Sequence, residues 1–223
     1  MSTAESRIPR IHEIAPDFEA KSTHGPIRLS DYTKAGKYVM LFSHPSDFTP
    51  VCTTEFIEFA KRQADWDRLG VQPIGVSIDS VYSHIAWVRD IEQHADVKIN
   101  FPVIADLDFK VSTLYGMVHE AVSDTSTVRA VFVIDPNQAI RTILYYPMQL
   151  GRNVDEIVRI FEALRVADAN KVSLPANWQP GGQVIVPAPA TVDDAAKRTN
   201  GGGAGLDVQT WYLSKKTLEE TTK

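Results

Sequence analysis

Four runs of mostly apolar residues mark the strands that the sequence predicts. They are residues 38–43, 71–78, 130–135 and 139–146. The first is continuously apolar up to its last residue, which is typical of a strand buried on both faces. The last two are joined by Asp-Pro-Asn-Gln, a short polar connection with proline that predicts a β-hairpin.

Helices are predicted where apolar side chains recur every three or four residues. This spacing occurs over residues 52–69, 81–95 and 153–167, and the first of these segments ends at Gly70. The order of elements is then β-α-β-α-β-β-α. That order predicts an α/β fold of the thioredoxin-like kind, with a central mixed sheet flanked by helices, and residues 11–34 form an N-terminal extension to it.

The amino-acid composition of the chain changes after about residue 168. Proline and glycine become frequent, which predicts an extended, wrapping segment. Within it, residues 201–205 read as a flexible turn and residues 206–213 as a late strand. So few residues cannot bury a core alone. We therefore expect a thioredoxin-like domain over residues 1–168 and a smaller C-terminal arm over residues 169–223 that packs on the first domain or forms a dimer.

Composition and charge exclude some partners. The 223 residues carry a net charge of −5, and no basic run is longer than a pair. Nucleic-acid binding needs a basic footprint, so we expect no nucleic-acid partner. The first residues lack the apolar stretch of a signal peptide, and no segment approaches the length of a membrane span. We therefore expect a cytoplasmic protein without a membrane partner.

Cys52 is the only cysteine, which excludes an internal disulfide, a Cys-x-x-Cys pair and a multi-cysteine zinc site. A lone cysteine is commonly a small buried apolar residue. Here, however, Thr49 suits a helix N-cap and Pro50 the first helical position, so Cys52 falls in the first turn. Unpaired N–H groups and the helix dipole there favour the thiolate, which is the nucleophilic form. The position predicts a reactive thiol.

Sheet topology adds two arginines to the same corner. In a thioredoxin-like core, strand 130–135 runs antiparallel to strand 38–43, so it starts at the edge where the Cys52 loop begins. Arg129 immediately precedes that strand. The hairpin partner returns to the same edge, and Arg152 lies in the loop that follows it. We expect both arginines to lie near Cys52.

At this point the sequence resembles a known family. Pro45, Thr49 and Cys52 form the signature Pro-x-x-x-Thr-x-x-Cys. The surrounding Leu-Phe-Ser-His-Pro, Val-Ser-Ile-Asp-Ser, Gly-Arg-Asn and Pro-Ala-Asn-Trp-Gln-Pro-Gly segments are similar to those of peroxiredoxins, and most to the one-cysteine class with an extended C-terminal region. The resemblance runs from about residue 10 to residue 190.

The resemblance implies an antioxidant thiol peroxidase that reduces hydrogen peroxide and organic hydroperoxides. Cys52 would attack the peroxide and become a sulfenic acid. The Thr49 hydroxyl would hold the peroxide, Arg129 would stabilise the thiolate and the developing charge, and Pro45 would shield the site from water. Backbone N–H groups of the first helical turn would complete this environment.

The resemblance also implies supporting roles for His44, Arg152 and Glu55. No cofactor and no metal are expected. Because no second cysteine is present, the sulfenic acid would be resolved by an external thiol or another reductant. The protein would form homodimers, with a decamer as the larger assembly.

Three other interpretations stay open. A cysteine hydrolase would need an oriented histidine beside Cys52, and His44 is the candidate base. A metal site could draw on the six histidines, although their spacing shows no ligand pattern. An oligomeric holdase chaperone or a redox-signalling protein would not be an enzyme of this kind, and chaperoning would survive the loss of Cys52.

Overall fold

The computed structural model describes residues 8–119, 121–123, 125–201, 203 and 205–218. The chain divides into two compact units, with the second beginning at Asp155. We call these the first unit and the second unit and describe each by itself. The expected domain boundary after residue 168 stays a prediction.

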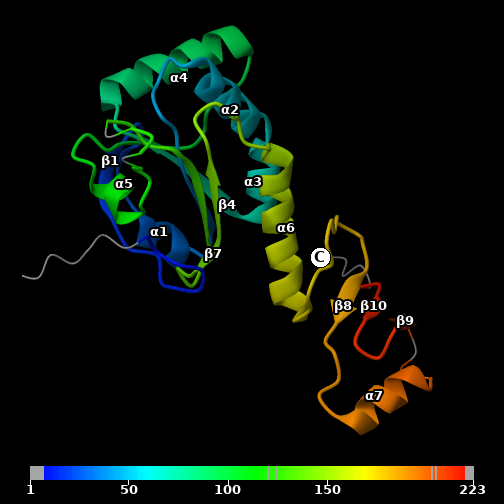
Figure 1. Ribbon diagram of the computed structural model, residues 1–223. Coiled ribbons are helices and arrows are strands. Elements are labelled where there is room, and N and C mark those ends of the chain that lie inside the picture. The colour runs from blue at the N-terminus through cyan, green and yellow to red at the C-terminus, as the bar shows by residue number, and fades with distance from the viewer. Residues whose placement is uncertain (1–7, 120, 124, 202, 204, 219–223) are drawn as a thin grey trace, which may run out of the picture. The chain divides into compact units, whose positions relative to one another are not determined.

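The first unit is built on a seven-stranded mixed sheet in the order β2-β1-β5-β4-β3-β6-β7 (Figure 1). At its centre, β3 pairs parallel with β4 and antiparallel with β6. This arrangement confirms the predicted thioredoxin-like sheet. The strands are β1 (Glu19–Ser22), β2 (Gly25–Arg28), β3 (Tyr38–Ser43), β4 (Val71–Ser77), β5 (Val103–Ala105), β6 (Arg129–Ile134) and β7 (Ile140–Tyr146).

Alternate side chains of a strand point to opposite faces of the sheet. Because β3 is apolar and buried at every position but its last, Ser43, which is polar and buried, both faces of the sheet need helices to cover them. On β3, Leu41 belongs to the core cluster that includes Leu29 of α1 and Val111 of α5. Phe42, the next residue, packs its ring against Phe56 of α2, with centroids 5.6 Å apart. The helices of this unit are α1 (Leu29–Lys34), α2 (Pro50–Lys61), α3 (Gln63–Leu69), α4 (Val81–Ala95) and α5 (Lys110–Leu114).

The helix predicted over residues 52–69 is two helices, which is a correction to the sequence analysis. Arg62 ends α2 and opens α3 with a non-helical backbone (φ −92°, ψ 16°). The change of direction buries Trp66 completely, and its indole N–H donates to the carbonyl of Phe59 at 2.8 Å. Apolar spacing alone did not reveal this break, because neither glycine nor proline marks it.

The second unit contains most of α6 (Val154–Asn170) and a small sheet ordered β8-β10-β9. Its elements are β8 (Val184–Val186), α7 (Val192–Thr199), β9 (Asp207–Val208) and β10 (Ser214–Lys216). Of the strand predicted over residues 206–213, only Asp207–Val208 forms one, because the chain turns after Val208, where the N–H of Gln209 donates to the carbonyl of Leu213. The predicted turn over residues 201–205 lies partly outside the described residues.

Helix α7 was not expected in an extended segment. Thr191 caps it by accepting from the backbone N–H of Asp194 at 3.2 Å, a bonding pattern typical of helix N-termini. Among the residues that the structure describes, no helix combines the length and the apolar character that a membrane crossing requires.

Candidate active site

Cys52 lies where β3 passes through a loop into α2. Thr49 is the N-cap, with an extended backbone, and Pro50 occupies the first turn, as predicted. Cys52 follows in that turn and its side chain is fully buried. The Thr49 hydroxyl donates to the carbonyl of Ser46 at 2.8 Å and makes no cap bond to the helix. The cap position was therefore predicted correctly, while the hydroxyl bonds to the loop instead.

Arg129 is the first residue of β6 and contacts the thiol directly. Its Nη1 donates to Sγ of Cys52 at 3.2 Å and to Oε2 of Glu55 at 2.8 Å. Its Nε and Nη2 both donate to the carbonyl of Met148, at 2.9 and 2.8 Å. These bonds fix the plane of a guanidinium group that is almost fully buried. The topological expectation that placed Arg129 beside Cys52 agrees with this geometry.

Arg152 supports the site through Glu55, one turn after Cys52 on α2. Its Nε and Nη2 donate to the two Glu55 oxygens at 2.9 and 2.6 Å, a bidentate pairing. Its Nη1 donates to the carbonyls of Ser43 and Ala130 at 2.9 and 3.0 Å. Through these bonds Arg152 connects α2 to the last residue of β3 and to the beginning of β6.

The buried cluster of Arg129, Glu55 and Arg152 holds more positive than negative charge. Burial of the Glu55 carboxyl acts to raise its pKa, but the charge and hydrogen bonds of Arg152, with the charge of Arg129, outweigh burial and lower that pKa. One carboxylate thus faces two guanidinium groups. The surplus positive charge lies beside the Cys52 sulfur, which accepts a hydrogen bond from Arg129.

Pro45 and His44 lie on the loop that leaves β3, and both are buried. The His44 ring packs edge-on against Phe56, with centroids 4.9 Å apart, and lies 5.1 Å from the Trp87 ring. In the described part of the chain no hydrogen bond joins His44 to Cys52. His44 Nε2 lies instead 2.9 Å from Oδ1 of Asp47.

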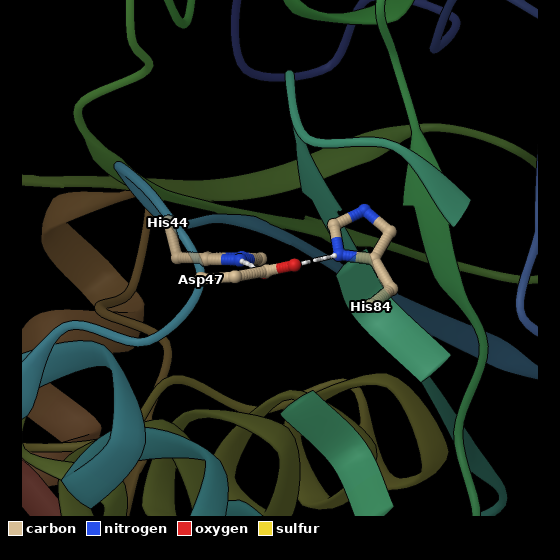
Figure 2. Close-up of side chains that lie close together, drawn as sticks. All are labelled: His44, Asp47 and His84. Carbon is tan, nitrogen blue, oxygen red and sulfur yellow. Dashed lines mark hydrogen bonds and ion pairs between the residues drawn. The ribbon is translucent and has the colours of Figure 1, made fainter. Parts of the chain in front are cut away.

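Asp47 is a site residue that sequence reasoning missed. Its carboxylate lies between His44 and His84, the latter on α4, and His84 Nδ1 is 2.9 Å from Oδ2 (Figure 2). The available signal was weak, since an aspartate in a polar loop is ordinary and its second partner comes from a distant helix. Candidate ligand atoms of the three residues lie within 4.8 Å of one another, a proximity that the spacing of the histidines along the chain did not reveal.

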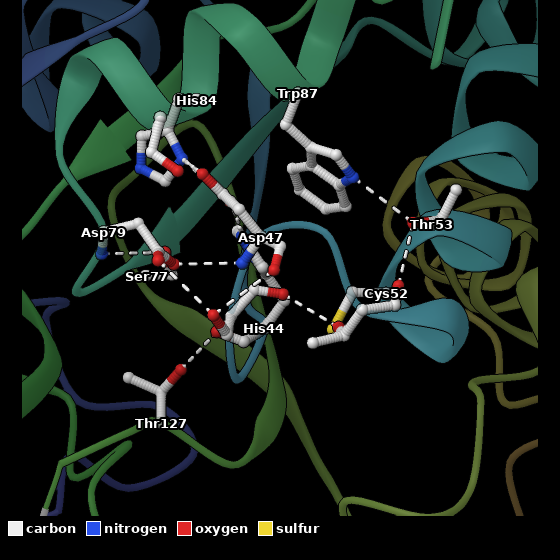
Figure 3. A network of polar contacts seen from close by, with 12 residues as sticks. His44, Asp47, Cys52, Thr53, Ser77, Asp79, His84, Trp87 and Thr127 are labelled. Atoms are coloured by element: carbon white, nitrogen blue, oxygen red, sulfur yellow. Dashed lines mark hydrogen bonds and ion pairs between the residues drawn. The ribbon is translucent and has the colours of Figure 1, made fainter. Parts of the chain in front are cut away.

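The residues around Cys52 and the His44–Asp47–His84 group are connected at the first turn of α2. Thr53, next to Cys52, accepts a hydrogen bond from the indole N–H of Trp87 at 3.2 Å, and Trp87 packs on His44 (Figure 3). Thr127 donates to the carbonyl of His44 at 2.7 Å and so holds the loop from the other side. The arrangement can support chemistry by one buried thiol that is in contact with a guanidinium group.

Comparison with known proteins agrees with this chemistry. Residues 11–143 match the model of the AhpC/TSA family, and residues 163–202 match that of the C-terminal domain of 1-Cys peroxiredoxin. A peroxiredoxin of Thermoplasma volcanium is 54% identical over 199 residues, covering 89% of this chain and 94% of that protein. A peroxiredoxin of Aquifex aeolicus is 47% identical, covering 95% and 98%.

Solved structures show the same likeness. The yeast mitochondrial 1-Cys peroxiredoxin, studied for thiol resolution via glutathione/thioredoxin systems, has a TM-score of 0.83 and 39% identity, covering 95% of this chain and all of that one. A cysteine-to-serine mutant of the Peroxiredoxin 6 of Arenicola marina has a TM-score of 0.82 and 31% identity, covering 96% and 100%. The chain therefore belongs to the AhpC/TSA family of peroxiredoxins, which are thiol peroxidases.

Proposed function

We propose that Cys52 reduces hydrogen peroxide and organic hydroperoxides through a sulfenic acid. The observation that carries this proposal is the hydrogen bond from Arg129 to the Cys52 sulfur in the first turn of α2. The thiolate attacks the terminal oxygen of ROOH, forming an S–O bond as the O–O bond breaks. The RO⁻ that leaves takes up a proton to become water or an alcohol, and Cys52 is left as Cys–SOH.

The surrounding residues stabilise this reaction electrostatically. Arg129 is held by Met148 and Glu55 before any substrate arrives, so it needs little reorganisation as charge moves onto the departing oxygen. The Thr49 oxygen, whose proton goes to Ser46, keeps its lone pairs to accept a hydrogen bond from the peroxide O–H. Pro45, which lacks an N–H, shields the thiol from water.

We propose that an external thiol completes the cycle. The chain has no second cysteine, so a thiol R′SH condenses with Cys–SOH to give Cys–S–S–R′ and water. A second external thiol then releases Cys52 and forms the disulfide of the reductant. The family likeness to a 1-Cys peroxiredoxin studied with glutathione/thioredoxin systems supports this route. Without a reductant, further peroxide would carry the sulfenic acid to sulfinic acid.

The test uses the full chain and its Cys52→Ser variant. With dithiothreitol as reductant, we expect the unmodified protein to consume peroxide and the variant to consume none. After one equivalent of peroxide without reductant, the intact mass should rise by one oxygen, and a dimedone-type reagent should trap the product. Substantial turnover by the variant would contradict the role of Cys52, and a disulfide-linked dimer as the main product would contradict resolution by an external thiol.

A further inference from the structure

A buried chain of three side chains lies beside the thiol and has no part in the chemistry above. It runs from His84 on α4 through Asp47 on the loop to His44 after β3 (Figure 2). The side chains of all three are at most 1% exposed. Asp79 holds the same loop by accepting from the backbone N–H of Asp47 at 3.1 Å, and it is the other acidic group whose charge acts on His44.

The partners of His84 determine where its protons lie. Its Nε2 is 3.0 Å from the carbonyl oxygen of Ile104, which can only accept, so Nε2 carries a hydrogen. Its Nδ1 is 3.0 and 2.9 Å from the two oxygens of Asp47. An ionised carboxylate also only accepts. With Asp47 ionised, both nitrogens of His84 carry hydrogens, and the ring is an imidazolium.

Asp47 is ionised because of its two partners. Burial acts to raise the pKa of this carboxyl, but the hydrogen bonds and charges of His44 and His84 outweigh burial and hold the pKa well below its usual range. A carboxylate between an imidazolium and a neutral imidazole leaves the buried group without net charge. That balance removes most of the penalty that an isolated buried charge would carry.

The same reasoning fixes the tautomer of His44. Its Nε2 faces the Asp47 carboxylate at 2.9 Å and therefore carries a hydrogen. Burial is the main cause that lowers the pKa of His44, against the opposing effect of Asp47, so this ring is neutral. The lone pair then lies on Nδ1, which is buried and has no hydrogen-bond partner among the described residues.

A metal ion fits this geometry less well than a proton does. Two donor atoms bound to one tetrahedral zinc at about 2.0–2.1 Å lie roughly 3.3 Å apart. The nitrogen–oxygen distances from Asp47 to its partners are 2.9 and 3.0 Å, which are hydrogen-bond lengths. Histidines that bind metals also donate their second nitrogen to an acceptor. His84 does so to Ile104, whereas the second nitrogen of His44 has no partner among the described residues.

We propose that Asp47 and His84 are positioning residues that hold His44 as the Nε2–H tautomer and so keep Nδ1 free to accept a hydrogen bond. The His44 ring packs against Phe56, which is one turn after Cys52 on the same face of α2. Its partner would be a hydroxyl group of the peroxide or of the sulfenic acid. The proposal rests on the proposed peroxidase function for its purpose, although its proton assignment can be measured without any turnover.

The direct test is nitrogen-15 NMR of the reduced, full-length protein labelled at histidine. Near neutral pH we expect both nitrogens of His84 to be protonated, and His44 to be protonated at Nε2 alone. A His84 with one bare nitrogen, or a His44 with hydrogen on Nδ1, would overturn the assignment. Stoichiometric zinc in the purified protein, measured by elemental mass spectrometry, would also overturn it. None of these readouts depends on peroxidase activity, so they fail independently of the proposed function.

Variants connect the tautomer to the rate. In Asp47→Asn the amide can donate to His44 Nε2, which moves the histidine hydrogen to Nδ1, and we expect sulfenic acid formation to slow by roughly 10- to 100-fold. In His84→Gln the amide still donates to Asp47, so the His44 tautomer should remain. Asp90→Asn, at an exposed position of α4, is the control and should leave the nitrogen shifts of His44 unchanged.

An Asp47→Asn protein with an unchanged rate and an unchanged His44 tautomer would contradict the proposal. Circular dichroism and a melting curve establish that each variant is folded. If Asp47→Asn does not fold, the unmodified protein and His84→Gln still decide the matter, because a His44 tautomer that changes in His84→Gln while Asp47 stays ionised would equally contradict it.

Discussion

Glu55 joins the two arginines of the site. Its carboxylate accepts from Arg129 and from Arg152, so two like charges are held within one buried cluster. Arg129 in turn reaches the thiol with one guanidinium nitrogen and the Met148 carbonyl with the other two. The planar shape of the Arg129 guanidinium group, here called the fork, is needed as well as its charge. Only a planar group of this kind can bond to Cys52, Glu55 and Met148 at once.

Arg129→Lys separates charge from geometry. Lysine keeps the positive charge but lacks the planar fork, so the bond to Cys52 cannot form together with those to Glu55 and Met148. We expect the second-order rate of Cys52 oxidation to fall by about 100-fold, the size typical of losing one preorganised donor. Stopped-flow tryptophan fluorescence with excess peroxide measures this rate.

Arg141→Lys is the matched control for that experiment. Arg141 lies on β7 and pairs with Asp135 of the hairpin at 3.3 Å. In Arg141→Lys, Cys52 should be oxidised at the same second-order rate as in the unmodified protein. An Arg129→Lys protein that oxidises at the unmodified rate would contradict the role proposed for the fork.

Glu55→Gln tests the buried ion cluster through stability. Removing the carboxylate leaves two buried guanidinium groups without their counter-charge, which typically costs about 3–5 kcal/mol. Urea denaturation near neutral pH should show this loss. Glu58→Gln is the control on the same helix, since Glu58 is half exposed and pairs with Lys61 at the surface, where an ion pair contributes at most about 1 kcal/mol.

Acid should reduce the stability of the unmodified protein for the same reason. The pKa values of Glu55 and Asp47 are lowered in the folded state, so their stabilisation is complete above the unfolded values of about 4. It is lost as the pH falls from there through the lower folded values. The stability gap between the unmodified protein and Glu55→Gln should therefore narrow below about pH 4. A gap that stays constant down to about pH 2 would contradict this.

The break between α2 and α3 belongs to the scale of elements. It turns the chain so that Trp66 is buried and donates to Phe59. Trp66→Phe keeps an aromatic ring but removes the indole donor to that carbonyl, which keeps the N–H of Arg62, and it leaves a small gap. We expect a loss of about 1–3 kcal/mol in unfolding free energy by urea titration. Tyr82→Phe, at an exposed position of α4, should change it by less than about 0.5 kcal/mol.

Elements were predictable from sequence where apolar spacing was long or continuous. The strand over residues 38–43 and the helix over residues 81–95 have the predicted bounds. By contrast, β5 has three residues and α5 has five, too few for a period to appear. Helix α7 was missed because it has no buried residue, and so carries no apolar stripe to mark it.

The candidate site was predictable to a similar extent. Arg129 and Arg152 could be placed near Cys52 because strand direction alone determines which ends meet. Asp47 could not be assigned to the site, because its contact is with His84 on α4, and strand order does not determine where a helix side chain meets the loop. The split of Arg129's donors between Cys52, Glu55 and Met148 was likewise beyond sequence, because it depends on side-chain directions and not on strand order.

At the scale of the whole molecule, we propose that the second unit takes part in forming a homodimer. Its residues Trp211 and Tyr212 are 47% and 57% exposed and contact each other. Large aromatic side chains at such positions are characteristic of interfaces. Replacing both with serine should lower the mass of the species seen by analytical ultracentrifugation. Ile11→Ser, at an exposed position of the first unit, is the control. A double variant that sediments like the unmodified protein would contradict this proposal.

The complete burial of the only cysteine gives the protein a built-in reporter of its own motion. An alkylating reagent cannot reach Cys52 while the loop and α2 stay in place, so labelling requires a local opening. When closing is faster than labelling, the labelling rate gives the free energy of that opening. Each labelled molecule carries a single tag, so intact mass spectrometry reads the opening directly, at one known position and without any engineered probe.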